Sequence, residues 1–128
     1  STNEGNTGRL APEMQRYIRY LKEEDPETGR PYSSRYIGSL VADVHRTMLY
    51  GGIYCYPGDT RNPNGKLRLM YENNPLAYLV EEAGGASTNG RIRTLDIQPS
   101  SLHERAPLFI GSVDDVSIAQ EFLSGKRS

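Results

Sequence analysis

A run of four apolar residues, Ile53-Tyr54-Cys55-Tyr56, constrains the fold of this chain more than any other stretch. A strand that is apolar at every position suits the interior of a sheet that is covered on both faces. The only cysteine of the chain, Cys55, lies within this run. We therefore expect a short buried strand here, and a buried thiol rather than a reactive one.

Helical patterns occur on both sides of this strand along the sequence. Apolar spacing predicts helices over about 12–24, 36–50, 74–83 and 113–123. Further strands are expected at 66–71, around Leu95 and Ile97, and at 107–111. Because helices and strands are interspersed, we expect an α/β fold with a mixed β-sheet flanked by helices. A chain of 128 residues is expected to form one domain, residues 1–128.

Two of the predicted helices carry start signals. Asn74-Pro75 has the residue types of an N-cap and a first helical position. Ser112, three residues ahead of Asp115, has the spacing of a capping box, with Asp in place of the usual Glu or Gln. Within the helix at 36–50, Asp43 and Arg46 fall off the apolar stripe. We expect them to pair on the surface, where such a pair contributes little to stability.

The stretch 56–72 holds the most suggestive polar side chains. A loop rich in Gly, Pro, Asn and Asp leads into the predicted strand 66–71, where successive side chains point to opposite faces. Lys66 and Arg68 would then share one face, and two adjacent cations suit an anion such as phosphate. An amphipathic edge strand with a solvated basic face fits the same pattern. Glu72 follows directly, where a carboxylate favours the positive end of the next helix.

Composition argues against several classes of function. The formal net charge is −1 and the basic residues form no broad stripe, so nucleic acid is not an expected partner. No apolar run approaches the roughly 20 residues that span a membrane. One cysteine and two separate histidines do not make a zinc site. A single cysteine also excludes an internal disulfide and fits a reducing compartment. No phosphate-binding glycine loop or serine-hydrolase motif is present. The chain begins at Ser1 without Met, which suggests a processed product or a piece of a longer chain.

Several long strings resemble class I fructose-1,6-bisphosphatase, and together they cover nearly the whole chain. They are residues 1–6, 34–46, 51–57, 64–69 with Tyr71-Glu72, and 74–78. They match only the C-terminal domain of that family, which implies the sugar-phosphatase fold for this chain. The Asp-Pro-Leu-Asp-Gly-Ser metal motif and the allosteric AMP site of the family belong to its N-terminal domain, and neither is found in this sequence.

The resemblance also implies roles for individual residues. Asn3, Tyr36, Tyr56 and Lys66 match positions that bind the 6-phosphate of the sugar. Arg35 matches the arginine that reaches the 6-phosphate bound by a neighbouring subunit.

Three further roles follow from the same resemblance. Leu40 matches a backbone contact to the sugar, and Arg68 lies toward the 1-phosphate. Glu72 matches the one metal ligand that this domain contributes, to a Mg²⁺ site whose other ligands are in the N-terminal domain. The catalytic set is therefore expected to be incomplete in this chain.

As a whole, the resemblance implies the C-terminal domain of a cytoplasmic gluconeogenic hydrolase. Its ligands would be fructose 1,6-bisphosphate and fructose 6-phosphate, and its partners the N-terminal domain and the other subunits of a homotetramer. A sedoheptulose-1,7-bisphosphatase domain shares the architecture and stays an alternative. A non-catalytic module that binds sugar phosphates, or that assembles with a partner, is the other.

Overall fold

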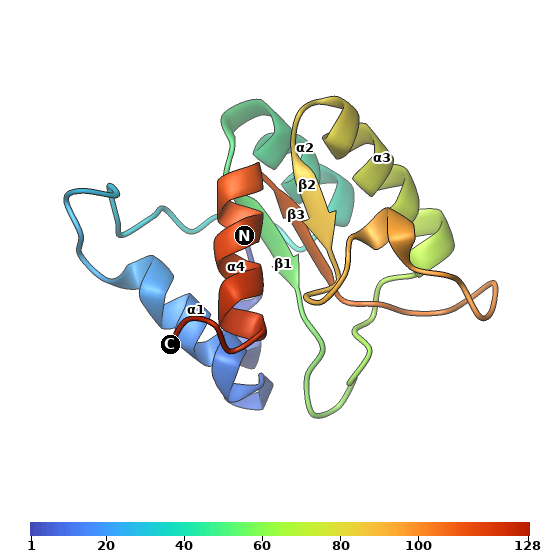
Figure 1. Ribbon diagram of the computed structural model, residues 1–128, viewed down its shortest axis with the longest axis horizontal. Coiled ribbons are helices and arrows are strands. Elements are labelled where there is room, and N and C mark those ends of the chain that lie inside the picture. The colour runs from blue at the N-terminus through green and yellow to red at the C-terminus, as the bar shows by residue number, and fades with distance from the viewer.

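The computed structural model describes all 128 residues, whose helices form two layers around a small sheet (Figure 1). The helices are α1 (Pro12–Lys22), α2 (Leu40–Tyr50), α3 (Asn74–Glu82) and α4 (Val113–Leu123). The strands are β1 (Ile53–Tyr56), β2 (Ala86–Thr88) and β3 (Leu108–Gly111). Shorter turns are the 3-10 helices Glu4–Arg9 and Thr94–Asp96 and the π-helical turn Leu69–Asn73. No helix combines the length and the apolar character needed to cross a membrane.

The central strand β3 pairs with both other strands, in the order β1-β3-β2. Both pairings are antiparallel, with Phe109 opposite Cys55 on one side and opposite Thr88 on the other. All four residues of β3 are buried. The predicted interior strand at 53–56 is confirmed as β1, and its first three residues are also buried.

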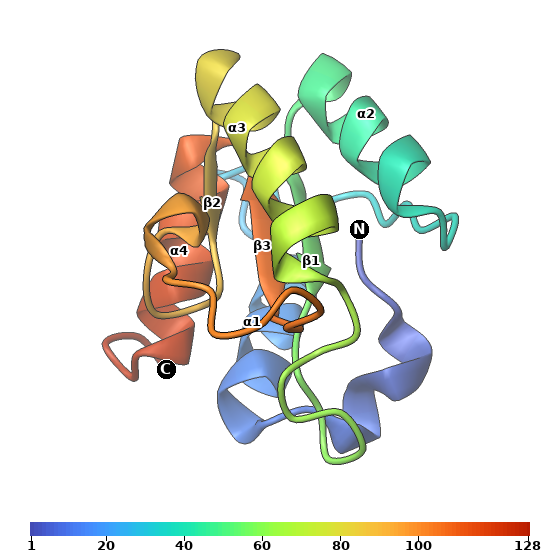
Figure 2. The ribbon, with the colours of Figure 1, turned by 90° about the vertical axis from the view of Figure 1, so that its right-hand side faces the viewer.

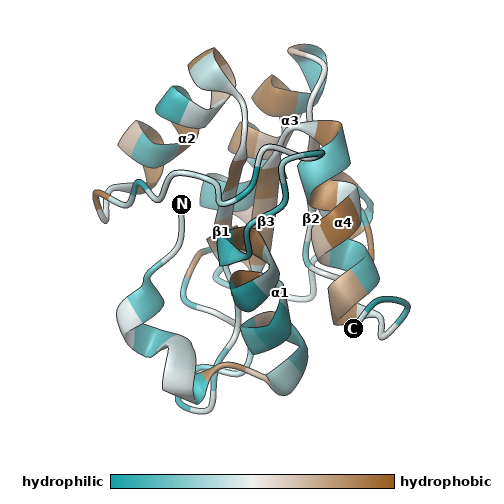
Figure 3. Ribbon diagram, turned by 90° about the vertical axis from the view of Figure 1, so that its left-hand side faces the viewer, coloured by the Kyte–Doolittle hydropathy of each residue, from teal (hydrophilic) through white to brown (hydrophobic).

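Side-chain alternation along β1 and β3 divides the core into two clusters. Cys55 and Phe109 face α1 and α4, whereas Tyr54, Leu108 and Ile110 face α2 and α3. This arrangement follows from the period of two in a strand, which sends neighbouring residues to opposite faces. Figure 2 shows α2 and α3 together against one face of the sheet, and in Figure 3 the hydrophobic ribbon is concentrated in the strands between the helix layers.

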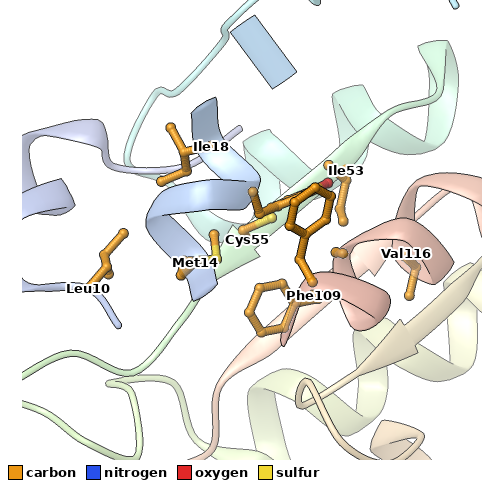
Figure 4. Close-up of a cluster of buried hydrophobic side chains, with 10 residues drawn as sticks. Leu10, Met14, Ile18, Ile53, Cys55, Phe109 and Val116 are labelled. Atoms are coloured by element: carbon orange, nitrogen blue, oxygen red, sulfur yellow. The ribbon is translucent and has the colours of Figure 1, made fainter. Parts of the chain in front are cut away.

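The larger cluster joins α1 and α4 to strands β1 and β3 (Figure 4). Met14 and Tyr17 of α1 pack here, and the ring of Tyr17 lies 5.6 Å from that of Phe122. Cys55 is 2% exposed, and burial raises the pKa of its thiol to about 12. The expectation of a buried thiol is therefore confirmed.

The sequence-based fold class is confirmed as α/β, but the predicted mixed sheet is not found within this chain. All three strands pair antiparallel. The strand expected around Leu95 and Ile97 is replaced by the turn Thr94–Asp96. The third strand is instead β2, which directly follows Gly84-Gly85. Its short sequence, Ala-Ser-Thr, lacks the apolar residues that mark a strand in a sequence.

The predicted strand 66–71 does not form. Its pairing with a neighbouring segment lasts one residue, the bridge between Arg68 and Arg105. The chain then coils, because the N–H of Asn73 donates to Arg68 O at 2.9 Å, the five-residue spacing of a π-turn. Leu69 is fully buried while Met70 is 40% exposed. The alternating pattern had predicted two faces that the coiled backbone does not form.

Neither predicted helix start signal caps its helix in the structure. The side chain of Asn74 forms no capping bond, and the helical backbone already runs through Asn73. The Ser112 hydroxyl accepts from the N–H of Gly52 at 3.0 Å instead of capping α4. At the predicted helix 36–50, regular structure begins only at Leu40. The residues before it are held by the contacts of Asp43 described below.

Replacing the central aromatic residue of the sheet tests the two-layer core. Phe109 is 2% exposed and lies between β1 and α4. Phe109→Ala is expected to lower the free energy of unfolding by about 3–5 kcal/mol, through lost burial and the cavity left behind. Leu102→Ala is the control, because Leu102 is 60% exposed and should change stability by less than about 0.5 kcal/mol. Urea unfolding measures both, and equal effects would contradict the assigned core.

Candidate functional site

Two of the predicted binding residues, Asn3 and Tyr56, lie together at the end of strand β1. Tyr56 is half-buried at the last position of the strand, opposite Leu108. It lines a small cavity of about 20 Å³ together with Asn3 and Asp59. The amide oxygen of Asn3 accepts from the N–H of Gly5 at 3.2 Å, as the cap of the first 3-10 turn. This leaves the NH₂ group of Asn3 free to donate to a ligand.

The loop between β1 and Lys66 is internally hydrogen-bonded. The Asp59 carboxylate accepts from the N–H groups of Arg61 at 2.8 Å and Asn62 at 2.7 Å. These bonds are the main reason that the pKa of Asp59 is lowered, and the nearby charges of Arg9 and Lys66 lower it further. Lys66 thus lies near enough to Asp59, which lines the cavity of Tyr56, to influence its pKa. Its ammonium group forms no ion pair within the chain.

Arg68 and Glu72 are joined by the π-turn. The backbone N–H of Arg68 donates to Glu72 Oε1 at 2.8 Å. The Arg68 side chain donates from Nη1 to the carbonyl oxygen of His103 at 3.0 Å. His103 Nδ1 lies 3.0 Å from the Tyr71 hydroxyl. A loop more than 30 residues away in the sequence thus orients the guanidinium group.

The predicted residues before α2 lie on the chain surface. Tyr36 is 37% exposed, and burial, with the neighbouring Tyr56 and Asp43, raises the pKa of its phenol. Leu40 packs partly buried against the cluster of Val44, Tyr54 and Leu108, as does Tyr56. Leu40 therefore lies on the same side of the sheet as Tyr56.

The structure brings most, but not all, of the predicted residues together. Asn3 and Tyr56 line one cavity with Asp59 at the end of β1. Tyr36 lies near enough to Tyr56, and Lys66 near enough to Asp59, to shift the pKa of a neighbouring group. Arg35 is separate: it donates to the carbonyl oxygen of Ser34 and lines a different cavity, of about 400 Å³, beside Arg46. The largest cavity, about 530 Å³, lies at the start of α1 and includes none of the predicted residues. Tyr36 and Lys66 are exposed, and neither lines the small cavity of Asn3 and Tyr56.

Asp43 and Arg46 pair as predicted, but the expectation that the pair lies on the surface is wrong. Asp43 is fully buried, and its carboxylate accepts from the N–H groups of Ile37 (3.1 Å) and Gly38 (3.1 Å). Arg46 Nη1 lies 2.9 Å from Asp43 Oδ1. Despite the burial of Asp43, these hydrogen bonds and the Arg46 charge lower its pKa. The three-residue spacing does not indicate that the pair is buried, because exposed pairs on helices have the same spacing.

Asp59 is the other residue whose role the sequence reasoning missed. A signal was present, because an Asp within a loop rich in Gly and Pro commonly bonds the backbone two or three residues further on. The pattern Asp59-Thr60-Arg61-Asn62 has this form.

The carboxylates of the chain do not form a metal site by themselves. No group of three or more His, Cys, Asp or Glu side chains is placed to hold a metal ion. Glu72 uses one oxygen for the N–H of Arg68 and leaves the other without a partner in the chain. A hard cation such as Mg²⁺ takes carboxylate oxygens but needs further ligands. Glu72 can therefore supply one ligand, and no more than that follows from this chain.

A close backbone approach provides a test of the loop structure. A Cβ atom at Gly58 would lie 2.1 Å from the carbonyl oxygen of Pro63. Gly58→Ala should therefore displace the loop and lower the free energy of unfolding by about 1–3 kcal/mol. Gly8→Ala is a matched control, because nothing lies within 4 Å of the added atom. Urea unfolding of both variants measures the difference, and a Gly58→Ala protein as stable as Gly8→Ala would contradict the loop structure.

The lowered pKa of Asp43 predicts a pH dependence of stability. Because the folded state lowers this pKa below the unfolded value, Asp43 stabilises the fold above about pH 4, and the stabilisation is lost as the pH falls through the folded pKa. Asp43→Asn should cost about 2–3 kcal/mol at pH 7, because it removes one partner of a largely buried pair. The stability difference from wild type should shrink at pH 3.

Chemical unfolding at pH 7 and pH 3 measures this difference. Glu24→Gln is the control, because Glu24 is exposed and forms no hydrogen bond or ion pair. A difference between wild type and Asp43→Asn that stays constant from pH 7 to pH 3 would show that ionisation of Asp43 does not stabilise the fold.

Comparison with known proteins assigns the chain to a family. The sequence model described as "Fructose-1-6-bisphosphatase, C-terminal domain" matches residues 1–124. The chain is 62% identical over 127 residues to the class 1 fructose-1,6-bisphosphatase of Chlorobium phaeobacteroides, and 58% identical to that of Chloroherpeton thalassium. Each alignment covers 99% of this chain, but only 38% and 36% of the respective relatives. The chain thus spans little more than a third of their length.

A solved structure supports the same assignment. The crystal structure of Leishmania major fructose-1,6-bisphosphatase in the T-state matches with a TM-score of 0.91 at 45% sequence identity. The match covers 97% of this chain and 38% of that one. The chain belongs to the fructose-1,6-bisphosphatase family and corresponds to its C-terminal domain.

Proposed function

We propose that this chain is the substrate-binding domain, residues 1–128, of a fructose-1,6-bisphosphatase. The enzyme would hydrolyse the 1-phosphate of fructose 1,6-bisphosphate to give fructose 6-phosphate, a step of gluconeogenesis, in the cytoplasm. The observation that carries this proposal is the cavity that Asn3 and Tyr56 share at the end of β1, with Tyr36 near Tyr56 and Lys66 near Asp59, in a chain of this family.

These four residues have the chemistry of a phosphate site. The hydroxyl groups of Tyr36 and Tyr56 and the ammonium group of Lys66 have no hydrogen-bond or ion-pair partner in the chain. The tyrosine hydroxyls and the Asn3 amide would donate neutral hydrogen bonds that fix the position of the 6-phosphate, and Lys66 would supply charge. Binding at this non-reacting phosphate positions the other end of the sugar for reaction.

The other end of the sugar would lie toward the π-turn. Arg68 would contact the 1-phosphate, and the Leu40 backbone would contact the sugar. Glu72 would provide one oxygen to a Mg²⁺ ion, whose other ligands come from a domain that this chain does not include. When bound, that ion would polarise the 1-phosphate and activate water. With one carboxylate available, this chain alone is not expected to hydrolyse phosphate esters.

Arg35 has a different proposed role from the four residues of the phosphate site. It does not line the cavity of Asn3 and Tyr56, and it lies on an exposed segment. A long charged side chain in that position suits a contact across a subunit boundary. We propose that Arg35 reaches the 6-phosphate bound by a neighbouring copy in a homotetramer, and that the N-terminal domain packs against this one.

Titration with fructose 6-phosphate tests the proposed binding site. Backbone NMR signals of Tyr36, Tyr56 and Lys66 are expected to shift, with a Kd of about 1 mM because half of the active site is absent. Lys66→Ala should weaken binding at least about tenfold through the loss of a charge-assisted hydrogen bond. Lys126→Ala is the matched control, because Lys126 is exposed in the C-terminal tail, and its Kd should equal that of wild type. Shifts confined to other regions would refute the proposed site.

A further inference from the structure

The segment that carries Arg35 and Tyr36 has no secondary structure of its own. Residues 33–39 form neither helix nor strand, and every one of them is exposed. A free segment of this kind would lose conformational entropy whenever it bound a ligand. Its geometry must therefore be imposed by contacts from outside the segment.

Two side chains of α2 provide those contacts. The carboxylate of Asp43 accepts from the N–H groups of Ile37 and Gly38, which directly follow Tyr36. Arg46 Nη2 donates to the carbonyl oxygen of Arg35 at 3.1 Å, directly before Tyr36. The backbone is thus held on both sides of Tyr36.

The two side chains also hold each other and are fixed to the core. Arg46 Nη1 lies 2.9 Å from Asp43 Oδ1, so one guanidinium group bridges a carboxylate and a carbonyl. The Thr47 hydroxyl donates to the carbonyl oxygen of Asp43 at 2.9 Å, and Val44 packs into the core beside Tyr54. The path of contacts runs from the sheet through α2 to Tyr36 without a gap.

Asp43 could serve a purely structural role instead. Asp43 resembles a residue that satisfies free N–H groups at the start of a helix, and such a role would affect stability alone. The bond from Arg46 is different, because its acceptor is a carbonyl oxygen, that of Arg35, whereas the start of a helix leaves N–H groups without partners. It adds nothing to the capping of α2 and acts only on the segment before it.

We propose that Asp43 and Arg46 are positioning residues that hold Tyr36 in place for the sugar phosphate. The inference rests on the proposed function, because it assigns these two residues to the 6-phosphate site. Neither residue touches the ligand. Arg46 acts by fixing the backbone on one side of Tyr36, and Asp43 fixes it on the other.

A double-mutant cycle between Arg46 and Tyr36 tests the inference. Arg46→Ala and Tyr36→Phe should each weaken fructose 6-phosphate binding about tenfold, and the double variant should be little weaker than either alone, because one residue acts through the other. Arg46→Lys should fall between wild type and Arg46→Ala, because an ammonium group lacks the fork that bridges both oxygens. Arg16→Ala is the matched control. Arg16 is also a helical arginine paired with a carboxylate three residues away, but it lies on α1.

A second measurement follows the segment without ligand. In Arg46→Ala, NMR order parameters of Tyr36 and Ile37 should fall while those of α2 stay unchanged. The Tm should also fall, because the buried Asp43 carboxylate loses its partner. Unchanged order parameters, or an Arg46→Ala protein that binds like wild type, would overturn the inference. So would a double variant about a hundredfold weaker than wild type, since independent effects multiply. If wild type itself fails to bind fructose 6-phosphate, the proposed function fails, and the positioning role fails with it.

Discussion

The burial of strand β3 on both faces is the constraint on which the remaining structure depends. Four residues, all buried, separate two apolar clusters and require helices on each side. Because β1 lies next to β3, its last residue, Tyr56, is placed where the outer loop begins. The helix α2 packs on the same sheet and brings Asp43 within reach of the segment before it. Core burial thus determines the relative positions of the polar groups.

The elements that could be predicted from the sequence are those with their own periodicity. The spacing of Met14, Tyr17 and Ile18 matches the buried face of α1, and the apolar run at 53–56 matches β1. The failures have tertiary causes. Lys66 to Tyr71 alternates like a strand, but only one residue finds a partner before the chain coils. The short strand β2 is held by pairing with β3, which no local pattern reveals.

The candidate site divides in a similar way. The family resemblance identified the candidate binding residues. From charge and spacing alone, Lys66 and Arg68 could also have formed a solvated basic face of a strand. The sequence could not predict the hydrogen bonds that hold these residues in position. Asp43 and Arg46 bond to backbone groups 5–11 residues earlier, and His103 bonds to Arg68 from 35 residues away. Such bonds to main-chain atoms depend on the fold, and because every residue type has main-chain atoms, the sequence does not reveal them.

Cys55 has a further consequence, as a natural reporter for folding studies. Its sulfur lies in the middle of β1, against both helices of the larger cluster, and its raised pKa suppresses the reactive thiolate in the native state. Labelling of this thiol must wait until the sheet opens. Because the chain has no other cysteine, the labelling rate isolates that one event. The opening of the core can therefore be timed in the unmodified chain, without an engineered dye or an added tryptophan.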